Sequence, residues 1–179
     1  MFIERKMVLD DWIKATSIAV MIPDRIIEPI DTTKWPIDYS DPRSIYLYSI
    51  LSAAYATGVI STNETIPGDV LIIGLGGGSS NNYFRHATEN INVTVVEIDK
   101  FIVNLAKKYF GLIEDDRQRC IVEDGAKFIK KCSETGQKFD LIILDASTSD
   151  KHQIMCPCEP FMDPSVFLYQ ISYQLEKTP

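Results

Sequence analysis

The chain has 179 residues, of which 45% are hydrophobic and 24% are charged, and its net charge at pH 7 is -7. This length suits one domain with a sizeable core, or one domain with a small appendage, and the composition argues against a disordered chain. The acidic balance argues against a broad basic surface that would hold nucleic acid. No apolar run approaches the roughly 18 residues of a membrane span, and the first residues lack a signal peptide's apolar stretch, so we expect a cytoplasmic protein with no membrane partner.

Neither the cysteines nor the histidines form a metal-binding pattern. Cys156 and Cys158 are separated by one residue, and no second closely spaced pair of thiols accompanies them. Zinc sites normally combine two such pairs, or a pair of cysteines with a pair of histidines. We therefore expect reduced thiols and no bound metal.

The chain divides into two parts of different character. Residues 1–66 are predicted to form a small appendage of strand and helix with a proline-rich connector. Residues 67–179 are predicted to form the main domain, because apolar runs of strand length alternate there with helical patterns. This alternation is typical of a doubly wound parallel α/β sheet.

In the appendage we expect a short strand over residues 2–9 and a weak helix over residues 11–21. A longer helix is expected over residues 43–57, with enough apolar residues to pack against the main domain. Asp41 would cap this helix, and Pro42 would occupy its first position, where a proline gives up no hydrogen bond.

Four strands are expected in the main domain, each a short apolar run: residues 70–73, 93–96, 120–122 and 139–144. Helices are expected between them, beginning near Ser79, after Asp99 and at Ala126, and a last helix is expected over residues 163–175.

A glycine-rich loop follows the first of these strands, with Gly74, Gly76 and Gly78 leading into the helix near Ser79. Glycines allow the backbone to turn sharply and to approach a ligand without an intervening Cβ. The N-terminus of the following helix would point its N–H groups at the same ligand. An ordinary strand-to-helix turn is the alternative interpretation.

Carboxylates stand at the ends of the three later strands. Glu97 follows Gly74 by 23 residues, close to the roughly 20 expected for the acid that binds ribose hydroxyls. Asp124, with Gly125 after it, can accept from an adenine amine, cap the next helix, or do both. Asp145 can orient an amine or accept its proton, with turn capping as the alternative. Because the carboxyl ends of parallel strands meet at one edge, the sequence predicts a single ligand site there.

These motifs resemble the spermidine-synthase-like proteins of the class I methyltransferase fold, and especially the domains that methylate lysine and the N-terminus of elongation factor 1-alpha. The resemblance covers residues 40–175. It rests on residues 70–79, 96–99, 124–125 and 139–145, and it extends to residues 149–151 and 155–157.

The resemblance implies a Rossmann-like sheet that binds S-adenosylmethionine. Gly74, Gly76 and Gly78 would surround the methionine part, Glu97 would bind the ribose, and Asp124 would lie beside the adenine. It also implies methyl transfer to a protein amine, either an N-terminus or a lysine, with a translation factor as the protein substrate.

Two departures separate the chain from the related aminopropyltransferases. Those enzymes carry an aspartate where Gly77 stands here, and an Asp-Ser-Ser-Asp motif where this chain has Asp145-Ala146-Ser147-Thr148. Only the first aspartate, which deprotonates the attacking amine, is present. Methyl transfer is therefore favoured, with aminopropyl transfer and a non-catalytic binding domain as the alternatives.

The related fold has seven strands, whereas four are expected here, so the sheet would be truncated after its fourth strand. Residues 141–144 would then form an apolar edge that invites association. We expect the sequence to be part of a longer gene product, or a partner to supply the remaining strands, or the protein to have lost activity. The chain alone is expected either to dimerise through this edge or to be poorly soluble.

Overall fold

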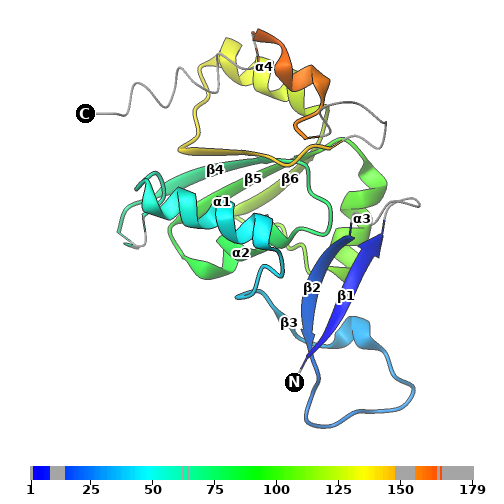
Figure 1. Ribbon diagram of the computed structural model, residues 1–179. Coiled ribbons are helices and arrows are strands. Elements are labelled where there is room, and N and C mark those ends of the chain that lie inside the picture. Colours follow the sequence, from blue (N-terminus) through cyan, green and yellow to red (C-terminus); the bar gives the residue numbers. More distant parts are fainter. Residues whose placement is uncertain are drawn as a thin grey trace.

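The main sheet has four parallel strands with helices on both faces, and a smaller antiparallel sheet stands at one end of it (Figure 1). We describe this architecture from a computed structural model of the chain. The structure describes residues 2–8, 15–61, 63, 65–147, 156–164 and 166.

The N-terminal sheet contains β1 (Phe2–Val8), β2 (Ala15–Met21) and β3 (Ile37–Asp38), which pair in the order β1-β2-β3. The expected strand at residues 2–9 is confirmed. The expected helix over residues 11–21 is wrong in its described part, since residues 15–21 form β2, and residues 11–14 lie outside the described residues. β2 is the middle strand, and its β-branched Ile18 and Val20 are buried in the core, so tertiary packing overrides the weak helical pattern.

Helix α1 (Ile45–Ala56) confirms the helix expected over residues 43–57, but its predicted cap is wrong. Ser44 is the N-cap residue, because Arg43 has a φ of +58° and turns the chain before the helix starts. Asp41 instead braces this turn: its carboxylate accepts from the Arg43 N–H at 2.9 Å and from the Tyr48 hydroxyl at 2.8 Å. A short 3-10 helix, η1 (Thr32–Lys34), precedes β3.

The four strands of the main sheet pair in the order β6-β5-β4-β7, and all pairs are parallel. Their bounds are β4 (Gly68–Ile73), β5 (Ile91–Glu97), β6 (Gln118–Val122) and β7 (Leu141–Leu144). All four expected strands are therefore confirmed. Within the described residues, β7 and β6 form the two edges of this Rossmann-like sheet.

The helices that connect these strands are α2 (Ser79–Ala87), α3 (Lys100–Tyr109) and α4 (Gly125–Thr135). Each begins within about one residue of its expected start, which confirms the alternation of strand and helix. A further 3-10 helix, η2 (Glu159–Met162), packs near the end of the described chain. The last expected helix, over residues 163–175, lies almost wholly outside the described residues.

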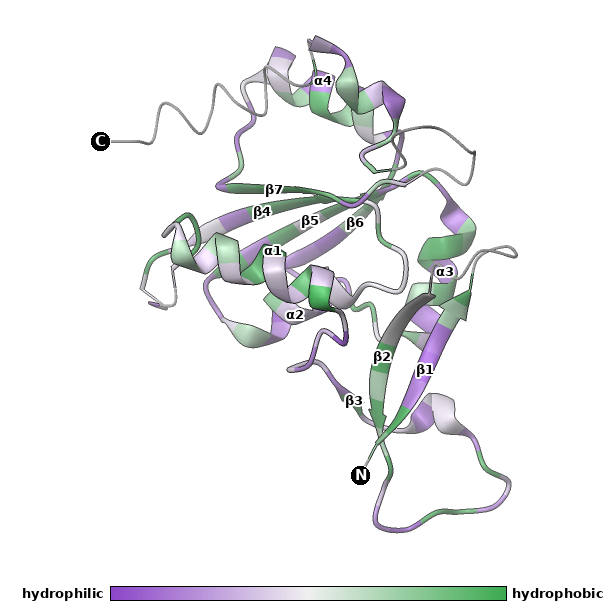
Figure 2. Cartoon of the chain, in the orientation of Figure 1, coloured by the Kyte–Doolittle hydropathy of each residue, from purple (hydrophilic) through white to green (hydrophobic). Residues whose placement is uncertain are grey.

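Strand β4 shows why the strands of the main sheet are continuous apolar runs in the sequence. Val70 and Ile72 are buried in a core with α1, α2 and α3, whereas Leu71 and Ile73 are buried in a second core with α4. Because both faces of the sheet are covered, consecutive residues must all be apolar. Figure 2 shows these hydrophobic stretches of the strands at the centre of the molecule.

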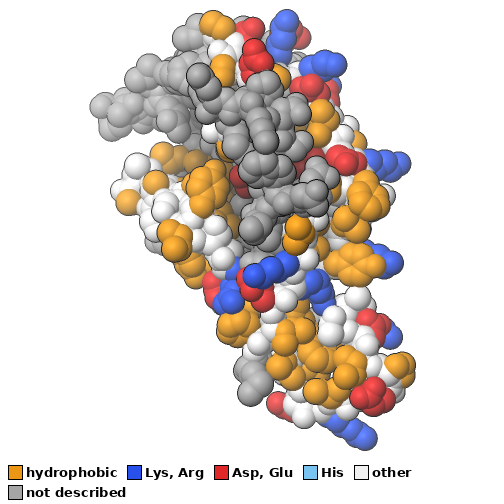
Figure 3. Space-filling view, turned by 45° about the vertical axis from the view of Figure 1, so that its right-hand side comes forward, with side chains coloured by type: hydrophobic (Ala, Val, Ile, Leu, Met, Phe, Trp, Pro, Cys, Tyr) orange, Lys and Arg blue, Asp and Glu red, His pale blue; other side chains and the backbone are white. Residues whose placement is uncertain are grey.

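The N-terminal sheet shares a core with the main sheet. Met7, Ile18 and Val20 are buried in the same cluster as β4 and α3, and the Arg5 guanidinium donates to the carbonyl of Tyr109 at the end of α3. The domain boundary at residue 66 stays a prediction. Hydrophobic side chains gather on the surface of the N-terminal part of the chain, at the end away from the main sheet (Figure 3). No helix in the described part of the chain is long and apolar enough to cross a membrane.

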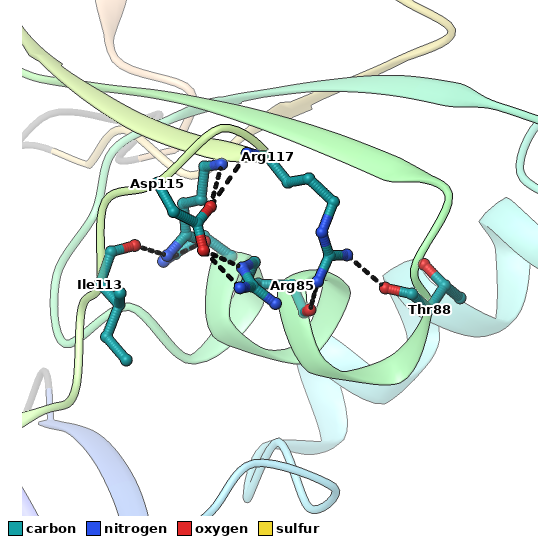
Figure 4. A network of polar contacts seen from close by, with 7 residues as sticks. Arg85, Thr88, Ile113, Asp115 and Arg117 are labelled. Carbon is teal, nitrogen blue, oxygen red and sulfur yellow. Dashed lines mark hydrogen bonds and ion pairs between the residues drawn. The ribbon is translucent and has the colours of Figure 1, made fainter.

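A polar network ties the end of α2 to the start of β6 (Figure 4). The Asp115 carboxylate accepts from the Arg85 guanidinium, with Nε at 2.8 Å, and from the backbone N–H groups of Arg117 and Gln118, each at 2.9 Å. The Arg117 guanidinium in turn donates to the carbonyl of Thr88 at 2.7 Å. The hydrogen bond from Arg85 and these backbone donors lower the pKa of Asp115 to about 2.

This network predicts an acid-sensitive contribution to stability. The stabilisation by Asp115 is fully present above its ordinary pKa of 3.8 and is lost as the pH falls from there through about 2. At neutral pH, Asp115→Asn should lower the free energy of unfolding by about 1 to 2 kcal/mol, since the ion pair is partly screened by solvent. Urea denaturation at a series of pH values measures both effects. The exposed neighbour Asp116 is the matched control, and an Asp116→Asn variant as unstable as Asp115→Asn would contradict the assignment.

Candidate functional site at the carboxyl edge of the sheet

The predicted site residues lie along one edge of the main sheet. The glycine loop follows β4, Glu97 ends β5, Asp124 follows β6 and Asp145 follows β7, and the strands are parallel and adjacent. Backbone hydrogen bonds continue beyond the strands, because the Gly74 N–H donates to the carbonyl of Val96 at 2.8 Å. The expectation that four strand ends converge is confirmed, and the roles of the individual residues stay predictions.

The glycine loop depends on backbone conformations that other residues rarely adopt. Gly74, Gly76 and Gly78 have φ values of +95°, +52° and +78°. A Cβ at Gly74 would lie 2.5 Å from the carbonyl oxygen of Asp145, so glycine also permits the loops after β4 and β7 to cross closely. Gly78 is the N-cap of α2 and offers no side-chain oxygen to the N–H groups of the first turn. Such a helix end suits a polar or anionic ligand group.

Glu97 anchors this loop from the end of β5. Its side chain is buried, one carboxylate oxygen accepts from the Leu75 N–H at 2.8 Å, and the other accepts from the Asp99 N–H at 2.9 Å. A carboxylate offers about four acceptor positions, so these two bonds leave capacity for further donors such as ribose hydroxyls. From the sequence we predicted that Glu97 contacts a ligand. Its hydrogen bond to the Leu75 N–H is visible only in the folded chain.

Asp124 and Gly125 have clear structural roles. The Asp124 carboxylate caps α4 by accepting from the Lys127 N–H at 3.0 Å, which confirms the capping alternative. A Cβ at Gly125 would lie 2.4 Å from Cγ2 of Ile73 and 3.0 Å from Cζ of Phe161, so α4 could not start this close to the sheet with a larger residue. Contact of either residue with a cofactor stays a prediction.

Asp145 lies near Tyr46, an aromatic residue that was not predicted from the sequence to belong to the site. Burial, followed by the Asp145 carboxylate and Cys156, raises the pKa of the Tyr46 phenol to about 12. Tyr46 belongs to the first turn of α1, about 100 residues before Asp145 in the chain. Residues 156–158 lie against the end of β7, because the Cys158 N–H donates to the carbonyl of Ala146 at 3.1 Å.

Exposed apolar side chains flank the carboxylates at this edge. Ile98, directly after Glu97, is 70% exposed, and Phe101 in the first turn of α3 is 64% exposed. Val122, at the end of β6, is 48% exposed. Ligand sites combine such apolar surfaces with a few polar acceptors, and this combination suits a flat heteroaromatic ring. The signal for this surface in the sequence is an isoleucine between two acids, Glu97 and Asp99.

No group of three or more His, Cys, Asp or Glu side chains that could hold a metal ion occurs among the described residues. The four cysteines carry free thiols. A hollow of about 400 Å³ lies at the opposite, amino edge of the sheet, and its lining includes Asp69, Asn92 and Arg117 but none of the predicted site residues.

Residues 55–162 match the spermine/spermidine synthase domain family. The chain belongs to this family. An eEF1A lysine and N-terminal methyltransferase homolog of Drosophila pseudoobscura pseudoobscura is 31% identical over 125 residues, which cover 69% of this chain and 19% of that protein. A polyamine aminopropyltransferase of Pyrobaculum islandicum is 38% identical over 85 residues, which cover 44% of this chain and 29% of that protein. The chain thus spans about a fifth of the length of the Drosophila methyltransferase relative.

The fold has a solved counterpart. The crystal structure of human methyltransferase-like protein 13 in complex with SAH aligns with a TM-score of 0.64 at 23% identity, covering 73% of this chain and 60% of that chain. This likeness confirms the Rossmann-like sheet of the class I methyltransferase type.

The close packing at Gly125 predicts a specific loss of stability. Gly125→Ala should lower the free energy of unfolding by about 1 to 3 kcal/mol, since the new methyl group overlaps Ile73 and the start of α4 must move away. Gly68→Ala in β4 is the control, because a Cβ there meets its nearest atom at 3.4 Å. Urea denaturation compares the two variants. Equal stability of both would show that the sheet and α4 can separate without cost.

Proposed function

We propose that this chain binds S-adenosylmethionine at the carboxyl edge of its sheet and transfers the methyl group to an amine of a protein. The observation that carries the proposal is the buried carboxylate of Glu97, held beside a glycine loop and an exposed apolar side chain. Family membership and relatives that are named as methyltransferases of eEF1A support it. The chain covers only a small part of the length of those relatives, so methyltransferase activity is proposed for it here and is not taken over from them.

The residues at the edge fit the parts of S-adenosylmethionine. Gly74, Gly76 and Gly78 leave room for the methionine part against bare backbone, and the first turn of α2 offers N–H donors to its carboxylate. The remaining acceptor positions of Glu97 suit the two ribose hydroxyls. Ile98 provides an apolar surface for the adenine, and the acceptor for the adenine amine is Asp124.

Asp145 is the proposed catalytic residue. S-adenosylmethionine supplies an activated methyl group, which an uncharged amine nitrogen accepts when it is held in line at about 3 Å, so positioning provides most of the catalysis. Asp145, on the loop after β7, would accept a hydrogen bond from this amine and then its proton. Tyr46 lies near Asp145, and its protonated hydroxyl is a second group that would hydrogen-bond the amine.

The proposed substrate is a protein amine, either an N-terminus or a lysine, on a translation factor. This follows the relatives that are named for action on eEF1A. The open, partly apolar surface around Ile98 and Tyr46 suits a macromolecule that presents one amine to the edge.

Aminopropyl transfer is the second candidate, because several relatives are named as polyamine aminopropyltransferases. The absence of a carboxylate at Gly77 speaks against it. The other departure, at Thr148, lies outside the described residues, as do residues 149–151.

Pairing of the β7 edge with a second copy or another partner also stays a prediction.

Replacement of Glu97 tests its proposed contact with the ribose. In calorimetric titration with S-adenosylmethionine, Glu97→Gln should weaken binding by about 10- to 100-fold, because it removes an acceptor from buried donors at a cost of about 1 to 3 kcal/mol. Glu123→Gln, one residue before Asp124, is the matched control and should bind normally. Circular dichroism checks that both variants are folded. Unchanged affinity in a folded Glu97→Gln variant would remove this residue from the site.

The choice of ligand separates methyl transfer from aminopropyl transfer. The wild-type chain should bind decarboxylated S-adenosylmethionine no more tightly than S-adenosylmethionine, because Gly77 offers no charge to the free amine of the decarboxylated form. Gly77→Asp should bind the decarboxylated form about tenfold more tightly than the wild-type chain does, through one new charge-assisted hydrogen bond. Gly77 does not have a positive φ, so its backbone conformation is not one that requires glycine. A wild-type preference for the decarboxylated form, with polyamine as product, would favour aminopropyl transfer.

A further inference from the structure

Two thiols lie beside the candidate site and have no role in the proposed reaction. Cys156 and Cys158 are separated by Pro157 and both are free thiols. Two residues of extended backbone span at most about 7 Å, and a disulfide joins Cα atoms that are about 4.4 to 6.8 Å apart. These two thiols can therefore be joined with little movement of the backbone.

The backbone on the Cys158 side of the pair is anchored. The Cys158 N–H donates to the carbonyl of Ala146 at 3.1 Å, and the Cys158 carbonyl accepts from the Phe161 N–H at 3.0 Å. Phe161 is buried in the core between α4 and the sheet, against which Cys158 also packs. The Cys158 thiol therefore keeps a defined place beside the loop after β7.

Cys156 is the accessible member of the pair. The residue is exposed, and its Sγ donates a weak hydrogen bond to the carbonyl of Leu144 at 3.8 Å. An oxidant in solution reaches this sulfur without any opening of the core. Cysteines that are oxidised reversibly are often exposed in this way beside a second thiol, which reacts with the first oxidation product.

The other two cysteines lack this arrangement, since neither has a second cysteine close to it in the sequence. Cys132 is buried on the inner face of α4, and burial raises the pKa of its thiol. Cys120 lies in β6, where burial, followed by the Glu114 and Glu97 carboxylates, raises the pKa of its thiol to about 12. Both thiols stay protonated at neutral pH, and the protonated thiol is the unreactive form.

The pair lies between two carboxylates of the candidate site. Leu144, which accepts from the Cys156 thiol, directly precedes Asp145. Burial raises the pKa of the Cys158 thiol, and the nearby Asp124 carboxylate adds to this effect. A change at these two sulfurs therefore takes place at the edge of the sheet where the amine is proposed to bind.

We propose that Cys156 and Cys158 form an oxidation site, which hydrogen peroxide converts from two thiols into one disulfide. The Cys156 sulfur attacks one peroxide oxygen and the O–O bond breaks. The other oxygen takes the Cys156 proton and leaves as water, and Cys156 becomes a sulfenic acid. The Cys158 sulfur then displaces the hydroxyl group, which leaves with the Cys158 proton as a second water. Two thiols are oxidised, and one hydrogen peroxide is reduced to two waters.

The disulfide is reversible and changes one side of the site. A disulfide across a single residue is strained, so thiol reductants open it readily. Its formation turns the Cys156 sulfur toward Cys158 and away from the carbonyl of Leu144, close to Asp145. The hydrogen bonds that hold the glycine loop to β5 are not affected. Oxidation should therefore hinder the amine and spare the cofactor, a consequence that rests on the proposed function.

Mass spectrometry of the full chain after peroxide treatment tests the proposal without any ligand or substrate. The reduced chain is exposed to hydrogen peroxide and unfolded, and its remaining thiols are alkylated before digestion. A disulfide between Cys156 and Cys158 should form, dithiothreitol should reverse it, and Cys120 and Cys132 should be fully alkylated. In Cys158→Ser, oxidation of Cys156 should stop at the sulfenic acid, which dimedone traps. Cys120→Ser is the matched control and should form the disulfide as the wild-type chain does.

Two results would overturn the proposal. One is full alkylation of all four thiols at a peroxide concentration that oxidises glutathione in the same solution. The other is a disulfide that joins two chains or that includes Cys120 or Cys132.

Activity is measured separately on the same samples, with eEF1A as the acceptor because relatives are named for action on it. Oxidation should lower the rate of methyl transfer by about 10- to 100-fold, since a small displacement of the amine is costly. The affinity for S-adenosylmethionine in calorimetry should not change, and Cys156→Ser should keep its rate after peroxide treatment. An oxidised chain as active as the reduced one would contradict the effect on the amine. Absence of transfer by the reduced chain would instead count against the proposed function, and the disulfide measurement would still decide the oxidation site.

Discussion

The buried carboxylate of Glu97 joins the two parts of the chain on which the rest of the site depends. One oxygen holds the glycine loop through the N–H of Leu75, and the other holds the start of the α3 connection through the N–H of Asp99. A buried carboxylate is stable only when its oxygens have donors, so the loop and the strand end are fixed together. This arrangement sets the position of the glycine loop relative to the end of β5.

The sheet can bring its strand ends together because it is covered on both faces and because glycine permits close crossings. Val70 and Ile72 face one core and Leu71 and Ile73 the other, so β4 cannot tilt without exposing apolar surface. Gly74 then lets the loop pass within contact distance of the backbone after β7. Rigidity below the edge and bare backbone at it are what a site for a small charged ligand requires.

The N-terminal sheet is anchored at its inner face and open at its outer edge. Arg5 donates to backbone carbonyls at the end of α3 and at the start of η1, and Met7 packs in the shared core. These contacts hold β1 in a defined orientation relative to the main sheet.

The order of strands and helices, the glycine loop and the carboxylates at the strand ends could all be predicted from sequence, because they depend on local periodicity and on residue types with few other uses. The same reasoning failed at β2, where partners on both edges override a weak helical pattern, and at Asp41, where the positive φ of Arg43 moves the helix start to Ser44. Only the tertiary structure could bring Tyr46 near Asp145, engage Glu97 with Leu75 and show that packing against Ile73 requires glycine at position 125. Each of these depends on residues that are distant in the chain and become neighbours when the sheet assembles.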